Sequence, residues 1–264
     1  MLEEALKKVV QNHIEVKVEQ NVGLNKVANS LWIGKKLFPQ HIMSINSFLQ
    51  NGFQYNLYVY DEVKNIPSGV NVLDGNDILP DSAIWYYGKG FNKGSPSGFS
   101  NEFRFTLLNT LGGLWVDTDV VLLKDFNLDK PYIFISERNV NNDIHPTSSV
   151  IYHDLSVYLF SGKLFSEAID NISYRNKDRV IHGETGPDLI TYLVNKYNLE
   201  EYVLPPNAFC SIAWHETNKL IDGTQLPEDV IGLHLFDAQS NLNDIDKKTF
   251  PYDSIIEQLK RKYL

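Results

Sequence analysis

The chain has 264 residues, of which 43% are hydrophobic and 22% are charged, and its formal net charge at pH 7 is −9. These values are typical of a soluble globular protein that is long enough to bury a sizeable core. An acidic chain without a long stripe of Lys and Arg is not expected to bind nucleic acid. A protein of this charge needs a cation to hold an anionic ligand, because its own charge repels that ligand.

The sequence also indicates a cellular compartment. The single cysteine, Cys210, excludes an internal disulfide framework and favours a reducing compartment. A lone cysteine is more often a small buried side chain than a nucleophile. The N-terminal segment MLEEALKKVV lacks the layout of a signal peptide, and no apolar run approaches the ~20 residues of a membrane span. We therefore expect a cytoplasmic protein that contacts a membrane at most peripherally, at its inner face.

The first half of the chain predicts strands that alternate with helices. This order is typical of a parallel α/β sheet. Ser100 is expected to cap a helix that ends at Gly112, and the loop before this helix is long enough to be functional. The expected elements are a helix at 2–10, an edge strand at 13–20, a strand at 26–34, a helix at 38–52, a strand at 53–61, a short strand with a polar turn at 69–80, a loop at 88–98, a helix at 100–113 and a strand at 114–116.

The second half is less regular but contains the same kinds of element. Pro187 is expected in the first turn of an amphipathic helix. The expected elements are strands at 129–137 and 148–155, helices at 161–175 and 184–197, a strand at 230–237 and a basic helix at 254–264. Because no repeat, low-complexity tract or Pro-rich linker interrupts the chain, we expect one domain that spans residues 1–264.

Residues 112–124, GGLWVDTDVVLLK, place Asp117 and Asp119 inside an otherwise apolar run. Carboxylates are costly to bury without a partner, and ligands of open α/β sheets gather at the carboxyl ends of the strands. In an extended segment the two side chains would lie about 6–7 Å apart, so they grip one ion together only where the backbone turns. We expect Asp119 to bind Mg²⁺ or Mn²⁺, and Asp117 to reach the metal through water or to hold a sugar hydroxyl. Such a metal would neutralise a diphosphate.

This segment resembles the core of a known enzyme family. Residues 100–124 are similar to glycosyltransferases that carry the DXD sugar-nucleotide motif (glycosyltransferase family 32-like), a group with bacterial capsular-polysaccharide transferases and Och1-like mannosyltransferases. That family shows S-D-x-x-R, a helix, and then G-G-x-Y/W-x-D-x-D. The residues that match in register are Ser100, Arg104, Gly112, Gly113, Trp115, Asp117 and Asp119.

Three further segments resemble the same family, whereas residues 130–180 carry little of the resemblance. Residues 29–37 match the N-terminal I-H-x-I-W-x-G strand at Trp32 and Gly34, with Asn29 in place of the histidine. Residues 185–191 match a T-G-P motif, and residues 232–237 match a late H-L-W-N segment. One departure bears on activity, because Asn101 stands where the family has aspartate. Asparagine still accepts and donates hydrogen bonds but carries no charge.

The resemblance implies a fold and a reaction. It implies a GT-A fold, with a Rossmann-like mixed central sheet flanked by helices. It also implies transfer of a hexosyl group with retention of configuration, from a nucleotide-sugar donor and with Mn²⁺ (or Mg²⁺) as cofactor. A UDP-sugar is the favoured donor. The implied acceptor is a glycan, for which a lipid-linked glycan is one option, and the implied process is capsule or other surface-polysaccharide synthesis. Nothing in the sequence indicates an oligomeric state.

The resemblance also implies roles for single residues. Asp119 would bind the metal, Asp117 would bridge ribose and metal, Arg104 would bond sugar or phosphate oxygens, and Trp32 would stack on the base. The catalytic candidates are Asp117, Asp119, Arg104, Asn101 and Asp188. The candidates for binding the nucleotide are Trp32, Gly34, Lys36, Ser100, Arg104, Asp117 and Thr118. The candidates for binding the metal are Asp119, Asp117 and His234, with Asp237 as a further option. The candidates for binding the diphosphate are Lys36, Lys89 and Lys93, with the 88–98 loop as a lid.

Each candidate has a plainer interpretation. The two aspartates could lie in a solvated surface turn, and Arg104 could form a surface ion pair. Trp32 and His234 could be core side chains, and Asp188 could simply stabilise a helix N-terminus.

Two other functions also stay open. The DTDVV run at 117–121 fits a haloacid-dehalogenase-type phosphatase with Asp117 as nucleophile, although more than 110 residues precede it and no late Asp-Asp pair follows. Asn101 also keeps open a protein that binds nucleotide sugars but is catalytically weak or inactive.

The C-terminal helix has two readings as well. Its basic end, KRKYL, follows apolar residues at 255, 256 and 259, and such a helix could rest on an anionic membrane. The alternative, which we favour, is a helix whose C-terminus carries favourable basic side chains.

Overall fold

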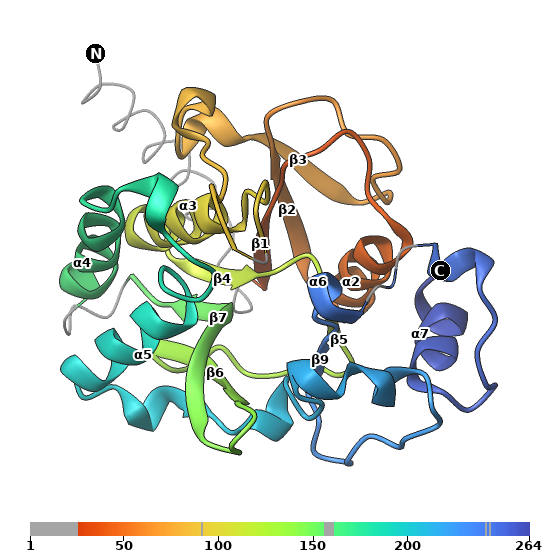
Figure 1. The fold of residues 1–264 in the computed structure, drawn as a ribbon. Helices are drawn as coiled ribbons and strands as arrows, with labels where there is room; N and C mark the ends of the chain where they lie inside the picture. Colours follow the sequence, from red (N-terminus) through yellow and green to blue (C-terminus); the bar gives the residue numbers. More distant parts are fainter. Residues whose placement is uncertain (1–25, 91, 156–160, 241, 243) are drawn as a thin grey trace.

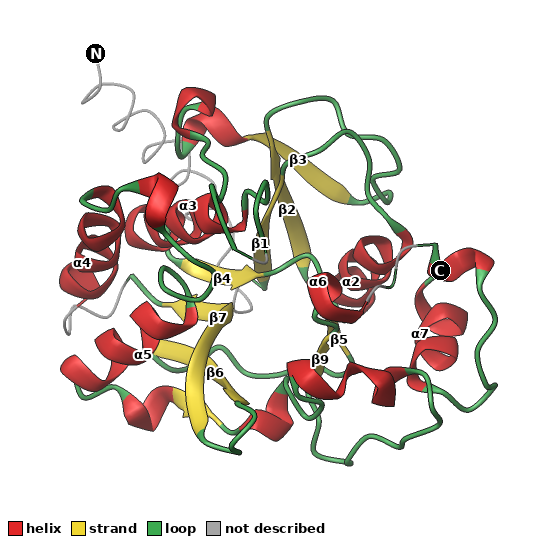
Figure 2. Ribbon diagram, in the orientation of Figure 1, coloured by secondary structure: helices red, strands yellow, loops and turns green. Residues whose placement is uncertain are grey.

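The computed structural model describes residues 26–90, 92–155, 161–240, 242 and 244–264. The helix expected at 2–10 and the strand expected at 13–20 lie outside the described residues. The helices are α2 (Pro39–Gln50), α3 (Ser97–Thr110), α4 (Ser161–Ser173), α5 (Pro187–Lys196), α6 (Asp237–Ser240) and α7 (Ile255–Tyr263). The strands are β1 (Val27–Trp32), β2 (Gln54–Val59), β3 (Val70–Asp74), β4 (Gly113–Val116), β5 (Val120–Leu122), β6 (Tyr132–Arg138), β7 (Ile144–His153), β8 (Val203–Leu204) and β9 (Gly232–His234) (Figure 1, Figure 2).

The central sheet has seven strands in the order β3-β2-β1-β4-β7-β6-β8. Strands β3, β2, β1 and β4 run parallel, whereas β7 runs antiparallel to both β4 and β6. The sheet is therefore mixed, as we expected. Strands β5 and β9 form a separate antiparallel pair, which holds the chain after β4 against the late strand.

The two faces of the sheet are covered by different helices, and β4 shows how the sequence achieves this. Side chains alternate across a strand, so Trp115 packs with Phe103 of α3 in one core, while Leu114 and Val116 pack with Phe48 of α2 in the other. Figure 1 shows α3 and α4 on one side of β1 and β4, and α2 on the other side. An apolar run on both faces is what a central strand covered on both sides requires.

Helix α3 begins earlier than the sequence suggested. We expected Ser100 at the N-cap, but the helix begins at Ser97, and the Ser100 N–H already donates to the Pro96 carbonyl at 3.0 Å. The sequence placed Gly98 at the end of the loop predicted for residues 88–98. In the structure its missing side chain admits Trp85, since a Cβ at this position would lie 2.1 Å from the indole ring. The added turn brings Ser97 and Ser100 to the site described below.

Gly112 sets the path from α3 into β4. Its φ of +64° is a left-handed conformation, and a Cβ there would lie 2.8 Å from the His153 carbonyl oxygen. Only glycine meets both conditions without strain. The turn therefore delivers Trp115 and the aspartates that follow it to the edge of the sheet at which β1 also ends.

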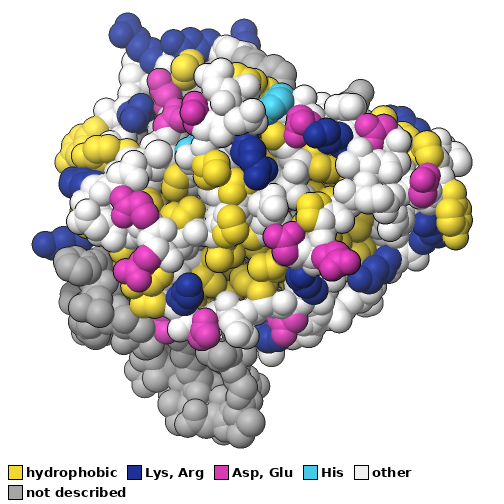
Figure 3. Space-filling model, turned by 90° about the horizontal axis from the view of Figure 1, so that it is seen from below, with side chains coloured by type: hydrophobic (Ala, Val, Ile, Leu, Met, Phe, Trp, Pro, Cys, Tyr) yellow, Lys and Arg dark blue, Asp and Glu magenta, His cyan; other side chains and the backbone are white. Residues whose placement is uncertain are grey.

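The apolar side of α7 is occupied by the protein core. Ile255, Ile256 and Leu259 are buried with side chains from α2, β5 and β9. Lys260 forms an ion pair with Glu257 at 2.6 Å. The apolar face of α7 is therefore not available to a membrane, which is the face that the membrane-binding interpretation of this helix requires. No helix in the described part of the chain is long and apolar enough to cross a membrane. On the face seen in Figure 3, acidic and basic side chains are interspersed around a central group of hydrophobic ones.

Candidate active site

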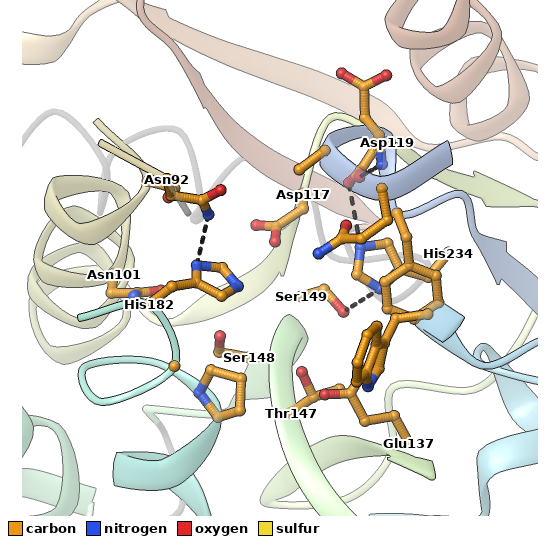
Figure 4. Close-up of a pocket in the computed structure, with 18 of the residues that line it drawn as sticks. Asn92, Asn101, Asp117, Asp119, Glu137, Thr147, Ser148, Ser149, His182 and His234 are labelled. Atoms are coloured by element: carbon orange, nitrogen blue, oxygen red, sulfur yellow. Dashed lines mark hydrogen bonds and ion pairs between the residues drawn. The ribbon is translucent and has the colours of Figure 1, made fainter. Parts of the chain in front are cut away.

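The chain turns sharply where β4 ends, and this turn decides how the two aspartates lie. The Val120 N–H donates to the Asp117 carbonyl at 3.1 Å, so residues 117–120 form a turn, which is the condition under which both acids can approach one ion. The Leu235 N–H then donates to the Asp119 carbonyl at 2.9 Å. As a result, ligand atoms of Asp117, Asp119 and His234 all lie within 4.8 Å of one another (Figure 4).

Asp119 is held by residues from the end of the chain. Its Oδ2 accepts from the Asp237 backbone N–H at 2.9 Å, and its Oδ1 lies 3.4 Å from His234 Nε2. Burial raises the pKa of Asp119, but the imidazole and the backbone N–H outweigh burial and hold this pKa well below the ordinary value. The same contact raises the pKa of His234, against the opposing effect of its burial. Asp119 is therefore ionised, as a metal ligand must be.

Asp117 has different partners. Its Oδ1 accepts from Trp115 Nε1 at 2.8 Å and lies 3.0 Å from Arg104 Nη2. Burial raises the pKa of Asp117, and the Arg104 guanidinium offsets this only in part, because the neighbouring Asp119 charge also raises it. The two acids of the motif thus have distinct environments, which suits distinct roles.

Arg104 is buried, with 4% of its surface exposed, so the surface ion-pair reading is wrong. Its guanidinium contacts the Ser148 carbonyl of β7 as well as Asp117, and its Nε donates to the Ser100 carbonyl at 3.3 Å. It also lies over the Trp115 ring, 5.1 Å from the ring centroid. Arg104 therefore ties α3 to both β4 and β7 and fixes the position of Asp117.

Asn101 lies against the loop that precedes α5. Its Nδ2 donates to Thr185 Oγ1 at 3.1 Å. Gly186 completes this contact, because a Cβ there would lie 3.0 Å from both polar atoms of Asn101 and from Ser148 Oγ. The T-G-P segment is therefore brought to Asn101 of α3. Asp188 follows in the first turn of α5, where it is exposed but lines the same cavity.

Trp32 ends β1 beside the acid turn. Its ring centroid lies 4.3 Å from that of His41, and its Nε1 is buried without a hydrogen-bond partner among the described residues. His41 and Gln40 both reach the Asp237 carboxylate, at 3.4 and 2.7 Å. The first turns of α2 therefore support α6 and the residues that hold Asp119.

Two cavities meet at the acid turn. The smaller, of about 320 Å³, is lined by Trp32, Ser100 and Thr118, and the larger, of about 770 Å³, by Asn101, Asp188 and His234. Seven residues line both cavities, namely Ser95, Ser97, Arg104, Asp117, Asp119, Asp237 and Ala238. Of the residues expected at the nucleotide, Trp32, Ser100 and Thr118 line the smaller cavity alone, whereas Arg104 and Asp117 line both.

Some candidates are not brought to these cavities. Lys36, Lys89 and Lys93 are exposed and line neither cavity, and Gly34 lines neither. Lys36 lies instead over the Phe38 ring, 4.9 Å from its centroid. The 88–98 loop reaches the larger cavity through other residues. One of these, Asn92, contacts His182 Nδ1 at 2.7 Å (Figure 4).

Several site residues were not expected from the sequence. Glu137 at the end of β6 and Ser149 in β7 line the larger cavity, and Ser149 Oγ lies 3.3 Å from His234 Nδ1 (Figure 4). Glu137 has the signal that marked the aspartates, an acid at the end of an apolar strand. Cys210 is buried, as expected, and its sulfur lies within 4.8 Å of ligand atoms of Glu137 and His234.

The seven-stranded mixed sheet flanked by helices defines the chain as a GT-A-like α/β protein, as expected. No protein-family profile and no curated protein matches the chain. Among solved structures, the apo-form glycosyltransferase GlyE of Streptococcus pneumoniae TIGR4 matches with 13% identity and a TM-score of 0.50, over 91% of this chain and 60% of that one. The PaToxG glycosyltransferase matches with 15% identity and a TM-score of 0.43, over 76% and 82%. The glycosyltransferase domain of the YGT toxin matches with 10% identity and a TM-score of 0.41, over 69% and 80%.

Proposed function

We propose that the protein is a retaining glycosyltransferase that moves a hexosyl group from a nucleotide sugar, with a UDP-sugar favoured, to a glycan acceptor. The observation that carries the proposal is the convergence of Asp117, Asp119 and His234 where the two cavities meet. The resemblance of residues 100–124 to DXD-motif transferases supports it, as does the fold shared with a protein described as a glycosyltransferase. On the same resemblance we propose a place in surface-polysaccharide synthesis in the cytoplasm.

The three converging side chains fit a divalent cation. Two carboxylates suit Mg²⁺ or Mn²⁺, and the imidazole nitrogen favours Mn²⁺ of the two. We assign Asp119 and His234 as direct ligands and Asp117 as a ligand through water or through the ribose. His234 would bind as the neutral imidazole, so the cation would replace the proton that Asp119 favours on this ring. When bound, the cation would supply positive charge to the diphosphate leaving group. This would allow a chain of net charge −9 to hold an anionic donor.

The chain's own residues position the two substrates. Trp32 offers a partly exposed indole for the base in the smaller cavity. The Arg104 guanidinium, between both cavities, orients Asp117 and adds fixed positive charge near the diphosphate. Asn101 leaves its Oδ1 to accept from a donor-sugar hydroxyl, because its Nδ2 is used by Thr185. Asp188 faces the same cavity from α5.

In the reaction, the acceptor hydroxyl oxygen bonds to the anomeric carbon as the bond from that carbon to the diphosphate breaks. The products are the glycoside, the nucleoside diphosphate and one proton.

Asp117 is poorly placed for the phosphatase alternative. Its Oδ1 is engaged by Trp115 and Arg104, and its Oδ2 lies 3.4 Å from Arg104 Nη1. Both oxygens of the required nucleophile would first have to leave these donors.

The test is donor hydrolysis. The protein is incubated with Mn²⁺ and a panel of UDP- and GDP-sugars, and nucleotide release is followed. We expect slow, metal-dependent hydrolysis of at least one donor, lost in Asp119→Ala and kept in Asp222→Ala, which changes an exposed acid outside both cavities. Cleavage of p-nitrophenyl phosphate would instead support the phosphatase. A melting-temperature shift with donor but without turnover would support a binding protein.

A further inference from the structure

Three residues that line the larger cavity have no role in the donor site described above, and we refer to them together as its second wall. They are Glu137 at the end of β6, His145 at the start of β7 and Trp214 at the start of the 3₁₀ helix Trp214–Leu220. Glu137 and His145 are paired across the β6–β7 hairpin, and directly opposed residues share a face of the sheet. None of the three lines the smaller cavity.

Trp214 is the aromatic part of this wall. It is 37% exposed, although the large aromatic side chains of the sheet, such as Trp115, are buried. Its ring contacts His215 edge-on, with centroids 5.2 Å apart. A partly exposed indole in a cavity that also contains hydrogen-bonding side chains offers a flat apolar surface beside those groups. This arrangement can bind the apolar face of a sugar ring.

The charge of the larger cavity restricts what this wall binds. Five acids line it, namely Asp117, Asp119, Glu137, Asp188 and Asp237. Among the described residues that line the cavity, Arg104 is the sole Lys or Arg, and it is paired with Asp117. Glu137 is 7% exposed, and no Lys or Arg in the described part of the chain forms an ion pair with it. Outside the site proposed for the divalent cation, an anionic group on a ligand would meet carboxylates here without an unpaired Lys or Arg.

We infer that Glu137, His145 and Trp214 form the subsite for the accepting sugar, and that this sugar is a neutral or amino sugar rather than a sugar phosphate or uronic acid. The inference rests on the proposed transferase function and deepens it. The Trp214 ring packs against the apolar face of the sugar, while Glu137 and His145 bond its hydroxyls. The cavity volume of about 770 Å³ lies within the range of ligand sites, about 300–1,000 Å³. A lipid-linked acceptor is compatible only if its diphosphate lies outside this cavity.

The first experiment measures sugar binding without a donor. Saturation-transfer NMR is recorded with methyl β-glucoside, glucosamine, glucuronic acid and glucose 6-phosphate as probes. We expect the first two to bind and the two anions to bind at least fivefold more weakly. Trp214→Ala should weaken methyl glucoside binding about tenfold, Trp214→Phe should restore most of it, and Tyr174→Ala, at an aromatic residue that is 88% exposed and outside both cavities, should not change it.

Glu137→Gln tests the charge requirement separately. This variant keeps the side-chain shape, so it should reduce the discrimination against glucuronic acid severalfold without weakening the neutral probe to the same degree. Equal binding of neutral and anionic probes, or a Trp214→Ala variant that binds like the unaltered protein, would overturn the inference. Because these readouts contain no donor, they differ from failure of the proposed function, which would appear as absent nucleotide release from every nucleotide sugar.

Discussion

Arg104 and Asp117 form an ion pair whose cation is almost completely buried, with Nη2 and Oδ1 3.0 Å apart. The guanidinium lies between α3, β4 and β7, because it contacts the Ser148 carbonyl as well as Asp117. The pair therefore has a structural role in addition to its proposed role beside the diphosphate.

Replacing Arg104 separates these two roles. Removing one member of a buried pair leaves the other charge without its partner, so Arg104→Met should lower the free energy of unfolding by about 3 kcal/mol. Urea denaturation measures this change. The double variant Arg104→Met/Asp117→Asn should recover part of the loss, because it no longer leaves an unpaired carboxylate. An Arg104→Met protein as stable as the unaltered one would contradict the structural role assigned to the pair.

Gly186 predicts a defect that is specific to the donor sugar. A Cβ at this position would lie 3.0 Å from both polar atoms of Asn101, so Gly186→Ala should displace the amide and raise the donor KM severalfold. Gly52→Ala is the matched control, because Gly52 has a φ of +82° and nothing within 4 Å of a new Cβ. It should cost about 1 kcal/mol of stability from backbone strain and leave KM unchanged. Steady-state donor hydrolysis and urea denaturation distinguish the two effects.

Asn101 stands where the resembled family has aspartate. A carboxylate would accept a stronger hydrogen bond from a sugar hydroxyl, by about 1 kcal/mol, and the Thr185 hydroxyl can reverse its bond to donate. Asn101→Asp should therefore lower the donor KM about fivefold. Asn109→Asp, on the same helix and outside both cavities, should leave KM unchanged. No change in Asn101→Asp would mean that this side chain does not touch the donor.

His153 predicts how stability depends on pH. The ring is buried and stacked on Tyr132, and its Nδ1 lies 2.9 Å from the Leu108 carbonyl. Burial lowers the pKa of His153 below its ordinary value of 6.5, so the unfolded chain binds the proton more readily than the folded protein does. The contribution of His153 to the free energy of unfolding should be constant above pH 6.5. Below this pH the free energy of unfolding should fall, because the unfolded chain takes up the proton first. His153→Gln should flatten this part of the urea-measured stability profile, and an unchanged slope would contradict the prediction.

The sequence predicted the central sheet and most helices because their signals are local. Alternation in residues 53–61, helical spacing in residues 38–52 and the glycine stop at Gly112 each depend on neighbours along the chain. The errors arose where a distant contact changed the local preference. Gly98 resembles a loop residue, but Trp85 packs against it within a helix. The sequence left open whether the backbone turns at residues 117–119, and the contact with Leu235 decides it. That residues 1–264 form one domain stays a prediction.

The candidate site divides in the same way. Asn101, Arg104, Asp117 and Asp119 were predicted together because they belong to one continuous motif between residues 100 and 119. The lysine candidates were chosen by charge alone, and charge does not indicate where a flexible exposed side chain lies.

The sequence by itself determined that two carboxylates would end a central strand, since acids inside an apolar run need a partner wherever the chain places them. Only the tertiary structure decided which partners they have. Asp119 and the Asp237 N–H that holds it are 118 residues apart, and Glu137 of β6 and Trp214 of a later 3₁₀ helix line the same cavity. Contacts of this kind depend on packing between elements, which no local pattern encodes.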